Sequence, residues 1–331
     1  MRKRIDFIDY SKGLGIFFVV FGHVYCGNNI VTNWIYSFHM PLFFILSGFL
    51  LYFEKERNFK KLFLRKCKSL IIPYLTFSII NMIGNYFIKD MSINSLKIDS
   101  LNIFTLYGLY ALWFLIALFI AECIFLFSKN NIKKKRNKVL FYLVIIGVAL
   151  VLVFINYKYH NKALKKFNTA LIRSIVGLMF INIGYYLYKF ISKINLKVYQ
   201  ILIIALISIG GSVLNKPVNL SGLQFNNLFL YVFNSITGSL TIIFFSKKIN
   251  ESRILNFLGK NTLIIMATHQ LIIEAILKSS LIKYLNDIMI IFIILLLEYP
   301  LIKIINKYLP FMLVKKREKS IVNKENNVVI G

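Results

Sequence analysis

The chain has 331 residues, of which 58% are hydrophobic and only 16% are charged, and its mean hydropathy is +0.68. A soluble domain needs a larger polar share to cover its interior, so this composition indicates an integral membrane protein. The net charge of +28 does not indicate nucleic-acid binding, because Lys and Arg form short clusters between apolar runs, as they do in the loops of membrane proteins.

Apolar runs of about 20 residues, the length that crosses a bilayer, recur along the whole sequence. We therefore predict an all-α polytopic membrane protein, a bundle of about ten transmembrane helices. The expected spans are 12–29, 34–53, 70–88, 103–127, 138–156, 169–190, 198–214, 223–246, 262–281 and 288–308. Residues 1–314 then form one transmembrane domain, and residues 315–331 a basic, disordered cytoplasmic tail that is attracted to anionic lipid.

The distribution of basic residues predicts the orientation, because Lys and Arg are retained on the cytoplasmic side. Most of them fall in 54–68, 128–138, 246–260 and the tail, which share one side of the bundle if every span crosses. The segment 157–166 is also basic and runs against the rule. We expect both termini to be cytoplasmic and the protein to be a multi-pass protein of the cell membrane, in a bacterium the cytoplasmic membrane.

Four ionisable residues, Asp9, Lys12, His23 and His39, lie on the first two apolar segments. Each costs several kcal/mol in a bilayer unless it is paired or faces a wet cavity. Lys12 and His23 are eleven residues apart, which on a helix returns nearly to the same face and rises about 16 Å. Gly15 lies between them, so this face is expected to offer a narrow wall for a long, thin molecule. Asp9 is placed to pair with Lys12 across one turn.

The second segment runs in the opposite direction and places His39 about 22 Å from its cytoplasmic end, at a depth comparable to that of His23. Ser47 continues the polar face of His39 two turns further on. Taken alone, a membrane histidine often bonds only a backbone carbonyl, and Lys12 alone could be a snorkelling boundary residue. Two histidines at matched depth above an aligned cation favour a functional site.

The sequence resembles one known family in several places. DYSKGLGIFFVVFGH at 9–23 and IYSFHMPLFFILSGFLL at 35–51 resemble the opening of the membrane acyltransferase 3 family, whose members O-acylate sugars and cell-envelope polymers. The resemblance continues through LFLRKCKSLIIPYL at 62–75, LWFLIALFIAE at 112–122, FLGKNTLIIMATHQL at 257–271 and LEYPLIK at 297–303. Many members carry Arg where this chain has Lys12. Lys keeps the positive charge, but it cannot make the two parallel hydrogen bonds by which Arg binds a phosphate.

The resemblance implies an O-acetyltransferase that moves an acyl group from cytoplasmic acyl-CoA, most often acetyl-CoA, to a hydroxyl of a cell-surface or lipid-linked sugar, such as an exopolysaccharide of the cell envelope. No permanently bound cofactor is implied. The coenzyme phosphates are expected among four basic residues: Lys12, Arg65, Lys66 and Lys68. His23 is expected to act as the general base, and His39 to orient it, to bind the acceptor or to stabilise the oxyanion.

Several residues keep more than one interpretation. Trp113 and Ser47 are candidates for lining the substrate channel, although a Trp near a helix end is often an interfacial anchor. His269 is read as structural or channel-lining. Glu122, Arg173, Glu274 and Glu298 lie within apolar runs and should pair across helices or line a wet cavity.

The three cysteines, Cys26, Cys67 and Cys123, show no spacing typical of a disulfide framework or a metal site, and we expect no bound metal. No Ser or Cys is visibly paired with a base, which favours direct transfer over a covalent acyl-enzyme. Cys26, three residues after His23, is the one candidate for the covalent route.

Two other functions remain open from the residues. A transporter or flippase of a sugar or polysaccharide precursor also uses buried His, Arg and Glu, but two related halves are typical of it, and the sequence has no such repeat. A polysaccharide polymerase should carry a large outer loop, whereas the longest outer loops expected here are only about a dozen residues, near the ordinary length of connections. An enzyme is the favoured interpretation.

Overall fold

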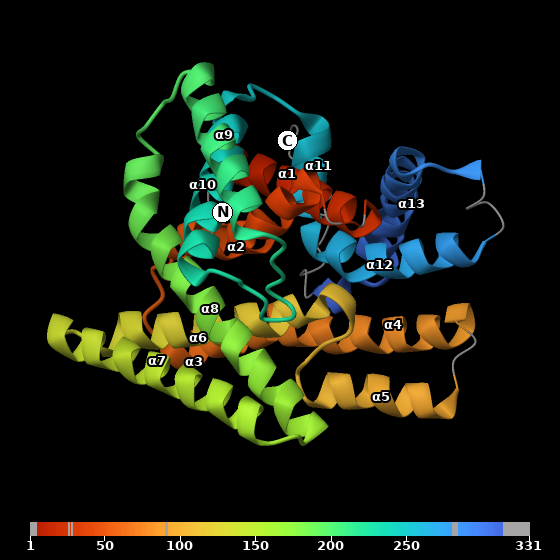
Figure 1. Ribbon diagram of the computed structural model, residues 1–331, viewed down its shortest axis with the longest axis horizontal. Helices are drawn as coiled ribbons and strands as arrows, with labels where there is room; N and C mark the ends of the chain where they lie inside the picture. The colour runs from red at the N-terminus through yellow and green to blue at the C-terminus, as the bar shows by residue number, and fades with distance from the viewer. Residues whose placement is uncertain (1–4, 26, 28, 90–91, 280–283, 314–331) are drawn as a thin grey trace, which may run out of the picture.

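The computed structural model describes residues 5–25, 27, 29–89, 92–279 and 284–313, and over these residues it is built from helices without a β-sheet (Figure 1). The long helices are α1 (Asp6–Val24), α2 (Ile30–Tyr52), α4 (Ile72–Lys89), α6 (Trp113–Asn131), α7 (Lys135–Lys158), α8 (Lys162–Ile191), α9 (Val198–Asn215), α10 (Leu228–Lys248), α12 (Thr262–Lys278) and α13 (Asp287–Tyr308). The shorter ones are α3 (Phe59–Lys66), η1 (Cys67–Ile71), α5 (Ile93–Phe104), η2 (Tyr110–Leu112), α11 (Arg253–Lys260) and η4 (Pro310–Leu313).

Within the described residues, nine helical segments are long and apolar enough to cross a membrane. They coincide with nine of the expected spans. The remaining span, 262–281, contains α12, whose 17 residues make it slightly shorter than the others. The prediction of an all-α polytopic membrane protein is therefore confirmed. The expected tail, 315–331, lies outside the described residues.

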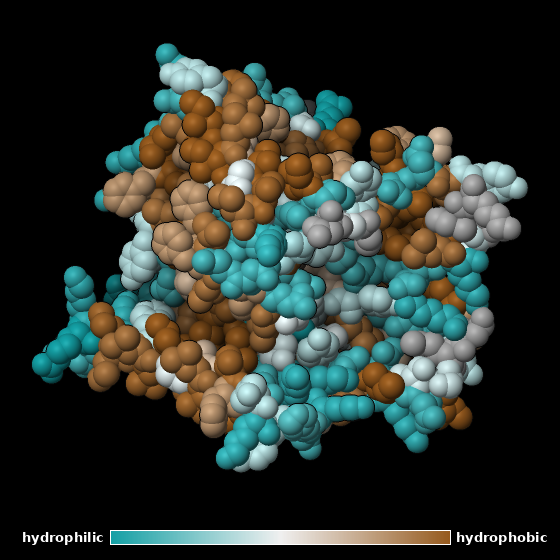
Figure 2. All heavy atoms as spheres, viewed as in Figure 1, coloured by the Kyte–Doolittle hydropathy of each residue, from teal (hydrophilic) through white to brown (hydrophobic). Residues whose placement is uncertain are grey.

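Helix α7 shows most directly that the bundle is surrounded by an apolar phase. The most apolar 18-residue stretch of α7 has a mean hydropathy of 2.9, yet no residue of the helix is buried against the rest of the protein. Figure 2 shows apolar side chains at the lower left, where α7 lies, and hydrophilic ones at its tip. An apolar helix with no buried face is stable only against lipid.

Helix α2 lies at the centre of the bundle and packs against α1, α8 and α10. Its contact with α8 is made by two glycines: a Cβ at Gly48 would overlap the carbonyl of Ile181, and a Cβ at Gly184 would overlap the carbonyl of Ile45. Small residues let membrane helices approach closely enough for backbone contact. This packing fixes the position of the polar side chains that α2 carries.

The corner between α11 and α12 is packed onto the first half of α1. Gly13 of α1 faces the carbonyl of Leu255, and Gly259 faces the carbonyl of Asp9. The sequence did not predict α11, because eight residues are too short to span a membrane. Its position beside α1 could not be predicted either, because the two helices are far apart in the sequence. Its consequence is that α12 begins next to Lys12.

Helix α5 is a further element that the sequence did not predict. Its N-cap, Ser92, accepts a hydrogen bond from the N–H of Ser95, and its polar face turns Asp99 toward α4, where Asn85 donates to the carboxylate at 3.1 Å. The helix lacks a long apolar run, so hydropathy gives no signal for it. It forms part of the wall of a polar cavity described below.

Candidate functional site

Lys12 lies at the boundary of two adjoining cavities. Its Nζ is 3.8 Å from Asp9 Oδ1, so the ion pair expected across one helical turn is present. The larger cavity, about 1100 Å³, opens at the beginning of α1 and is also lined by Lys55 and Lys260, with Asp6 beside Asp9. Three lysines and two carboxylates leave an excess of positive charge, which suits an anionic ligand. Neither Lys55 nor Lys260 was singled out from the sequence.

The smaller cavity, about 190 Å³, continues from Lys12 into the bundle between α1, α2, α6 and α12. Most of its wall is apolar, including Ile16 and Phe114, and Ser47 and Glu122 supply polar groups. The prediction for Gly15 was wrong in detail. A Cβ at Gly15 would lie 3.0 Å from both Leu42 and Phe43, so α2 fills that face and the hollow runs beside Ile16 instead.

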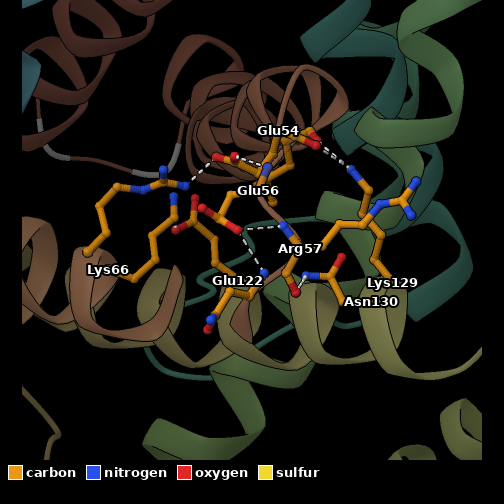
Figure 3. A network of polar contacts seen from close by, with 10 residues as sticks. Glu54, Glu56, Arg57, Lys66, Glu122, Lys129 and Asn130 are labelled. Carbon is orange, nitrogen blue, oxygen red and sulfur yellow. Dashed lines mark hydrogen bonds and ion pairs between the residues drawn. The ribbon is translucent and has the colours of Figure 1, made fainter. Parts of the chain in front are cut away.

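Glu122 joins three helices at the wall of this smaller cavity. Its side chain is 6% exposed, accepts a hydrogen bond from the Ser47 hydroxyl, and lies 2.6 Å from Lys66 Nζ (Figure 3). A buried carboxylate is tolerated only when it is paired and hydrogen-bonded, and both conditions are met here. The ion pair that sequence reasoning left open for Glu122 is therefore the one with Lys66.

The other two residues expected at the coenzyme phosphates lie elsewhere. Arg65 is paired with Glu54, and Arg65 and Lys68 line a separate cavity of about 400 Å³. Lys129 donates to the carbonyls of Leu51 and Glu54, both at 3.1 Å, and holds the end of α2 beside α6 (Figure 3). The four basic residues therefore do not share one cavity: Lys12 borders the cavities of about 1100 and 190 Å³, Lys66 contacts the smaller of these two through Glu122, and Arg65 and Lys68 line the third.

The loop that follows α2 is ordered by its own carboxylates. The N–H groups of Asn58 and Arg57 both donate to the Glu56 carboxylate at 2.9 Å, and these bonds lower the pKa of Glu56 because they stabilise its charged form (Figure 3). The loop keeps the basic residues of α3 close to the end of α2.

His23, near the end of α1, lies against α12 rather than against His39. Its ring centroid is 5.3 Å from that of His269, and Gln270 Nε2 lies 3.2 Å from its Nδ1. His269 is fully buried and its Nδ1 lies 2.7 Å from the carbonyl of Ile265. Because a carbonyl only accepts, Nδ1 carries the proton and Nε2 of the neutral ring is an acceptor. Among the described residues, Nε2 of His269 has no hydrogen-bond partner.

His39 has other neighbours than His23. Its Nδ1 donates to the carbonyl of Ile35 at 2.8 Å, and its ring centroid is 5.1 Å from that of Tyr36, which in turn lies 6.2 Å from the ring of His23. This hydrogen bond to a backbone carbonyl is the structural role considered above for a lone membrane histidine. Here the carbonyl belongs to the same helix. Tyr36, which the sequence did not single out, stands between the two histidines.

Trp113 begins α6 and is 7% exposed, so it is a buried residue and not an interfacial anchor. It lines a polar cavity of about 270 Å³ together with Arg173, Asn85, Lys89 and Asp99. Arg173 also lies within an apolar run, and its guanidinium carbon is 5.1 Å from the centroid of the Trp113 ring.

Helix α12 connects these features in a line. Thr262 borders both cavities at Lys12, His269 contacts His23, and Glu274 lies 2.7 Å from Lys89 of the polar cavity. At 1.5 Å per residue these three levels span about 18 Å along the helix. A substrate at Lys12 and another at Trp113 would therefore approach the histidines from opposite ends. The α12 segment carried little weight in the sequence interpretation, although His269 lay within a segment that resembled the family.

No metal-binding cluster of three His, Cys, Asp or Glu side chains occurs in the part of the chain that the structure describes. Cys67 and Cys123 are free and half-buried. Cys26, the candidate for an acyl-enzyme, lies outside the described residues. Glu298 accepts a hydrogen bond from Thr268 at 2.7 Å, so its partner is the residue next to His269.

The fold and the site define a polytopic membrane protein in which a basic cavity, a contact between half-buried His23 and fully buried His269, and a polar cavity follow one another along α12. The chain belongs to the acyltransferase 3 family, whose model, an acyltransferase domain, matches residues 5–308. The resemblance noted in the sequence is thereby confirmed, and the protein is a membrane-embedded acyltransferase. No curated protein and no solved structure matches the chain.

Proposed function

We propose that the protein is an O-acetyltransferase that moves an acyl group from cytoplasmic acyl-CoA to a hydroxyl of a cell-surface or lipid-linked sugar. The observation that carries the proposal is the contact between His23 and His269, which lies along α12 between the basic cavity at Lys12 and the polar cavity at Trp113. A transferase that joins substrates from two sides needs its reacting groups at such a meeting point.

The basic cavity is the proposed site of the donor. Coenzyme A carries several phosphates on a head group and a thin arm that ends in the thioester. Lys12, Lys55 and Lys260 supply point charges for the phosphates, and the narrower hollow beside Ile16 leads from Lys12 into the bundle. Acetyl is a small acyl group, which suits a hollow of about 190 Å³.

His23 is the proposed general base. Its neutral imidazole takes the proton of the acceptor hydroxyl, and the oxygen attacks the thioester carbonyl. The tetrahedral intermediate collapses with cleavage of the C–S bond, and the imidazolium returns the proton to the departing thiolate, which gives an ester and free coenzyme A. Gln270 and His269 hold the ring of His23 from the α12 side.

Transfer of labelled acetyl from acetyl-CoA to envelope glycan tests this proposal. Membranes that contain the wild-type protein should transfer the label, and membranes that contain His23→Ala at equal expression should not, while coenzyme A binding is retained. Normal turnover in His23→Ala would remove His23 as the base. A Cys26→Ser variant should keep full activity, because direct transfer needs no nucleophilic thiol.

A further inference from the structure

The polar cavity at Trp113 contains a buried positive charge that the donor site and the histidine pair do not use. Arg173, on α8, is 2% exposed and lines this cavity of about 270 Å³, which is near the lower end of the volumes that hold small molecules. Its Nε donates to the carbonyl of Ser221 at 2.8 Å and its Nη1 to the carbonyl of Tyr107 at 2.9 Å. Nη2 also donates to Ser221.

These contacts hold the guanidinium in place without neutralising it. Its carbon lies 4.3 Å from the ring of Tyr107 and 5.1 Å from that of Trp113, so aromatic faces cover its plane. In the described residues no carboxylate lies within ion-pair distance of Arg173. Carbonyls and rings carry no net charge, and a buried cation without a counter-ion is costly.

The acidic groups nearby are already engaged by other partners. Asp99 accepts a hydrogen bond from Asn85 at 3.1 Å, and Glu274 lies 2.7 Å from Lys89. An alternative is that Arg173 only anchors the segment between α9 and α10 through Ser221. That role explains the three hydrogen bonds, but it explains neither the uncompensated positive charge nor the cavity beside it.

The cavity lies close to the histidines because α4 and α12 run side by side in the same direction. Asn81 Nδ2 donates to the carbonyl of Ala267 at 3.1 Å, and Lys89 pairs with Glu274 further along both helices. Asn85, which lines the cavity, is one turn beyond Asn81, and His269 is two residues beyond Ala267. The cavity therefore begins within about one turn, roughly 5 Å, of the level of His269.

We propose that this cavity is the acceptor subsite and that it selects a saccharide carrying an oxyanion, a carboxylate or a phosphate, which binds Arg173. This inference rests on the proposed function for the identity of the acceptor as a sugar. The planar guanidinium suits the two oxygens of such a group, and Trp113 offers an apolar ring beside the polar groups of Asn85 and Asp99. The hydroxyl to be acylated then points toward His23.

Tryptophan fluorescence provides a direct test, because the chain has two tryptophans, Trp34 and Trp113. In a Trp34→Phe protein, Trp113 is the sole tryptophan, and excitation at wavelengths that tyrosine does not absorb makes it report on its own cavity. The probes are methyl β-D-glucuronide and methyl β-D-glucoside 6-phosphate, with methyl β-D-glucoside as the neutral match. We expect saturable fluorescence changes with at least one charged sugar, and an affinity at least about tenfold higher than for the neutral sugar. Comparison of the two charged probes distinguishes a carboxylate from a phosphate.

Arg173→Gln, in the same background, should reduce the affinity for the charged sugar to that for the neutral one, because the amide keeps a donor but loses the charge. Arg136→Gln, which removes an exposed arginine of α7, should keep the preference. Equal affinities for charged and neutral sugars in the unsubstituted Arg173 protein would overturn the proposal, whatever the folding of Arg173→Gln. A response to glycerol 1-phosphate as strong as to the sugar phosphate would also overturn it and identify a lipid-headgroup site.

The binding readout needs no acyl donor, so the two proposals can fail separately. Loss of acetyl transfer with intact binding of charged sugars would overturn the transfer reaction alone. Transfer to glycan without any preference for charged sugars would overturn the oxyanion subsite alone.

Discussion

The imidazole ring of His23 on α1 lies 5.3 Å from that of His269 on α12, measured between ring centroids. The carbonyl of Ile265 fixes the second ring through Nδ1, so a rigid, fully buried imidazole stands beside the proposed base. His39 packs on Tyr36 instead. The contact between α1 and α12 is therefore the centre of the candidate site, and substitutions can separate the roles of its members.

Replacing His269 with Ala is expected to lower the kcat of acyl transfer at least about tenfold, which corresponds to about 1.4 kcal/mol of transition-state stabilisation. The reason is that the ring of His23 loses the neighbour that fixes its position. The KM for acetyl-CoA should stay unchanged, because Thr262 at the basic cavity is about 10 Å away along α12. Steady-state kinetics with labelled acetyl-CoA measure both constants.

His160→Ala is the matched control for that substitution, since His160 is exposed in the segment after α7, and its kcat should equal that of the wild type. A folded His269→Ala protein with unchanged kcat would contradict a positioning role for this histidine.

Replacing Lys12 with Ala is expected to raise the KM for acetyl-CoA roughly tenfold or more, since a hydrogen bond to a charged group contributes about 1.5–3 kcal/mol. The kcat should change little, because the phosphates contact the protein equally before and during the reaction. Lys12→Arg should restore most of the affinity. Lys55→Ala and Lys260→Ala should act in the same direction with smaller effects, because both side chains are exposed to solvent.

The effect of Lys12→Ala should shrink as the salt concentration rises, because mobile ions screen the attraction between lysines and phosphates. A KM for Lys12→Ala that equals the wild-type value at low salt would exclude the basic cavity as the phosphate site.

The sequence predicted the membrane class, the spans and the polar residues of the first two helices, because each follows from hydropathy and helical periodicity within one segment. Asp9 and Lys12 do pair, as their spacing of one turn predicts. What the sequence could not predict are contacts between distant segments. Nothing in the sequence of α1 indicates that the ring beside His23 is that of His269. Likewise, nothing in the sequence around Lys66 indicates that its ion-pair partner is Glu122.

Other differences arise where a local pattern is overruled by packing. Gly15 was expected to leave an open wall, but α2 fills it with Leu42 and Phe43, and the hollow lies beside Ile16. Trp113 has the position of an interfacial anchor in the sequence, yet the fold places it against Arg173. In both cases a neighbouring helix determines what surrounds the residue. The sequence pattern of a single segment carries no information about that neighbour.

Replacing Gly48 with Ala is expected to destabilise the protein by about 1–3 kcal/mol, because the added Cβ would overlap the carbonyl of Ile181 and force α2 away from α8. Thermal unfolding of the purified protein in detergent measures the loss. Gly147→Ala is the matched control: a Cβ there meets no atom of the described residues within 4 Å, and Ala has the better helix propensity. Equal unfolding temperatures for the two variants would show that the close approach of α2 and α8 is not required.

Breaking the ion pair between Lys66 and Glu122 should destabilise the protein mainly because it leaves a buried carboxylate unpaired. The attraction between the two charges should contribute less. Replacing Lys66 with Met leaves the buried Glu122 carboxylate without its cation, and we expect a loss of about 3–5 kcal/mol of unfolding free energy. The double variant Lys66→Met/Glu122→Gln should recover most of it, because no buried charge remains. Lys89→Gln breaks the pair with Glu274, in which the two side chains are 33% and 30% exposed, and should cost at most about 1 kcal/mol. Unfolding temperatures of the four proteins, wild type included, provide the comparison. Recovery in the double variant would assign the loss to the unpaired carboxylate, whereas losses of equal size for Lys66→Met and Lys89→Gln would mean that Glu122 is hydrated in the folded protein.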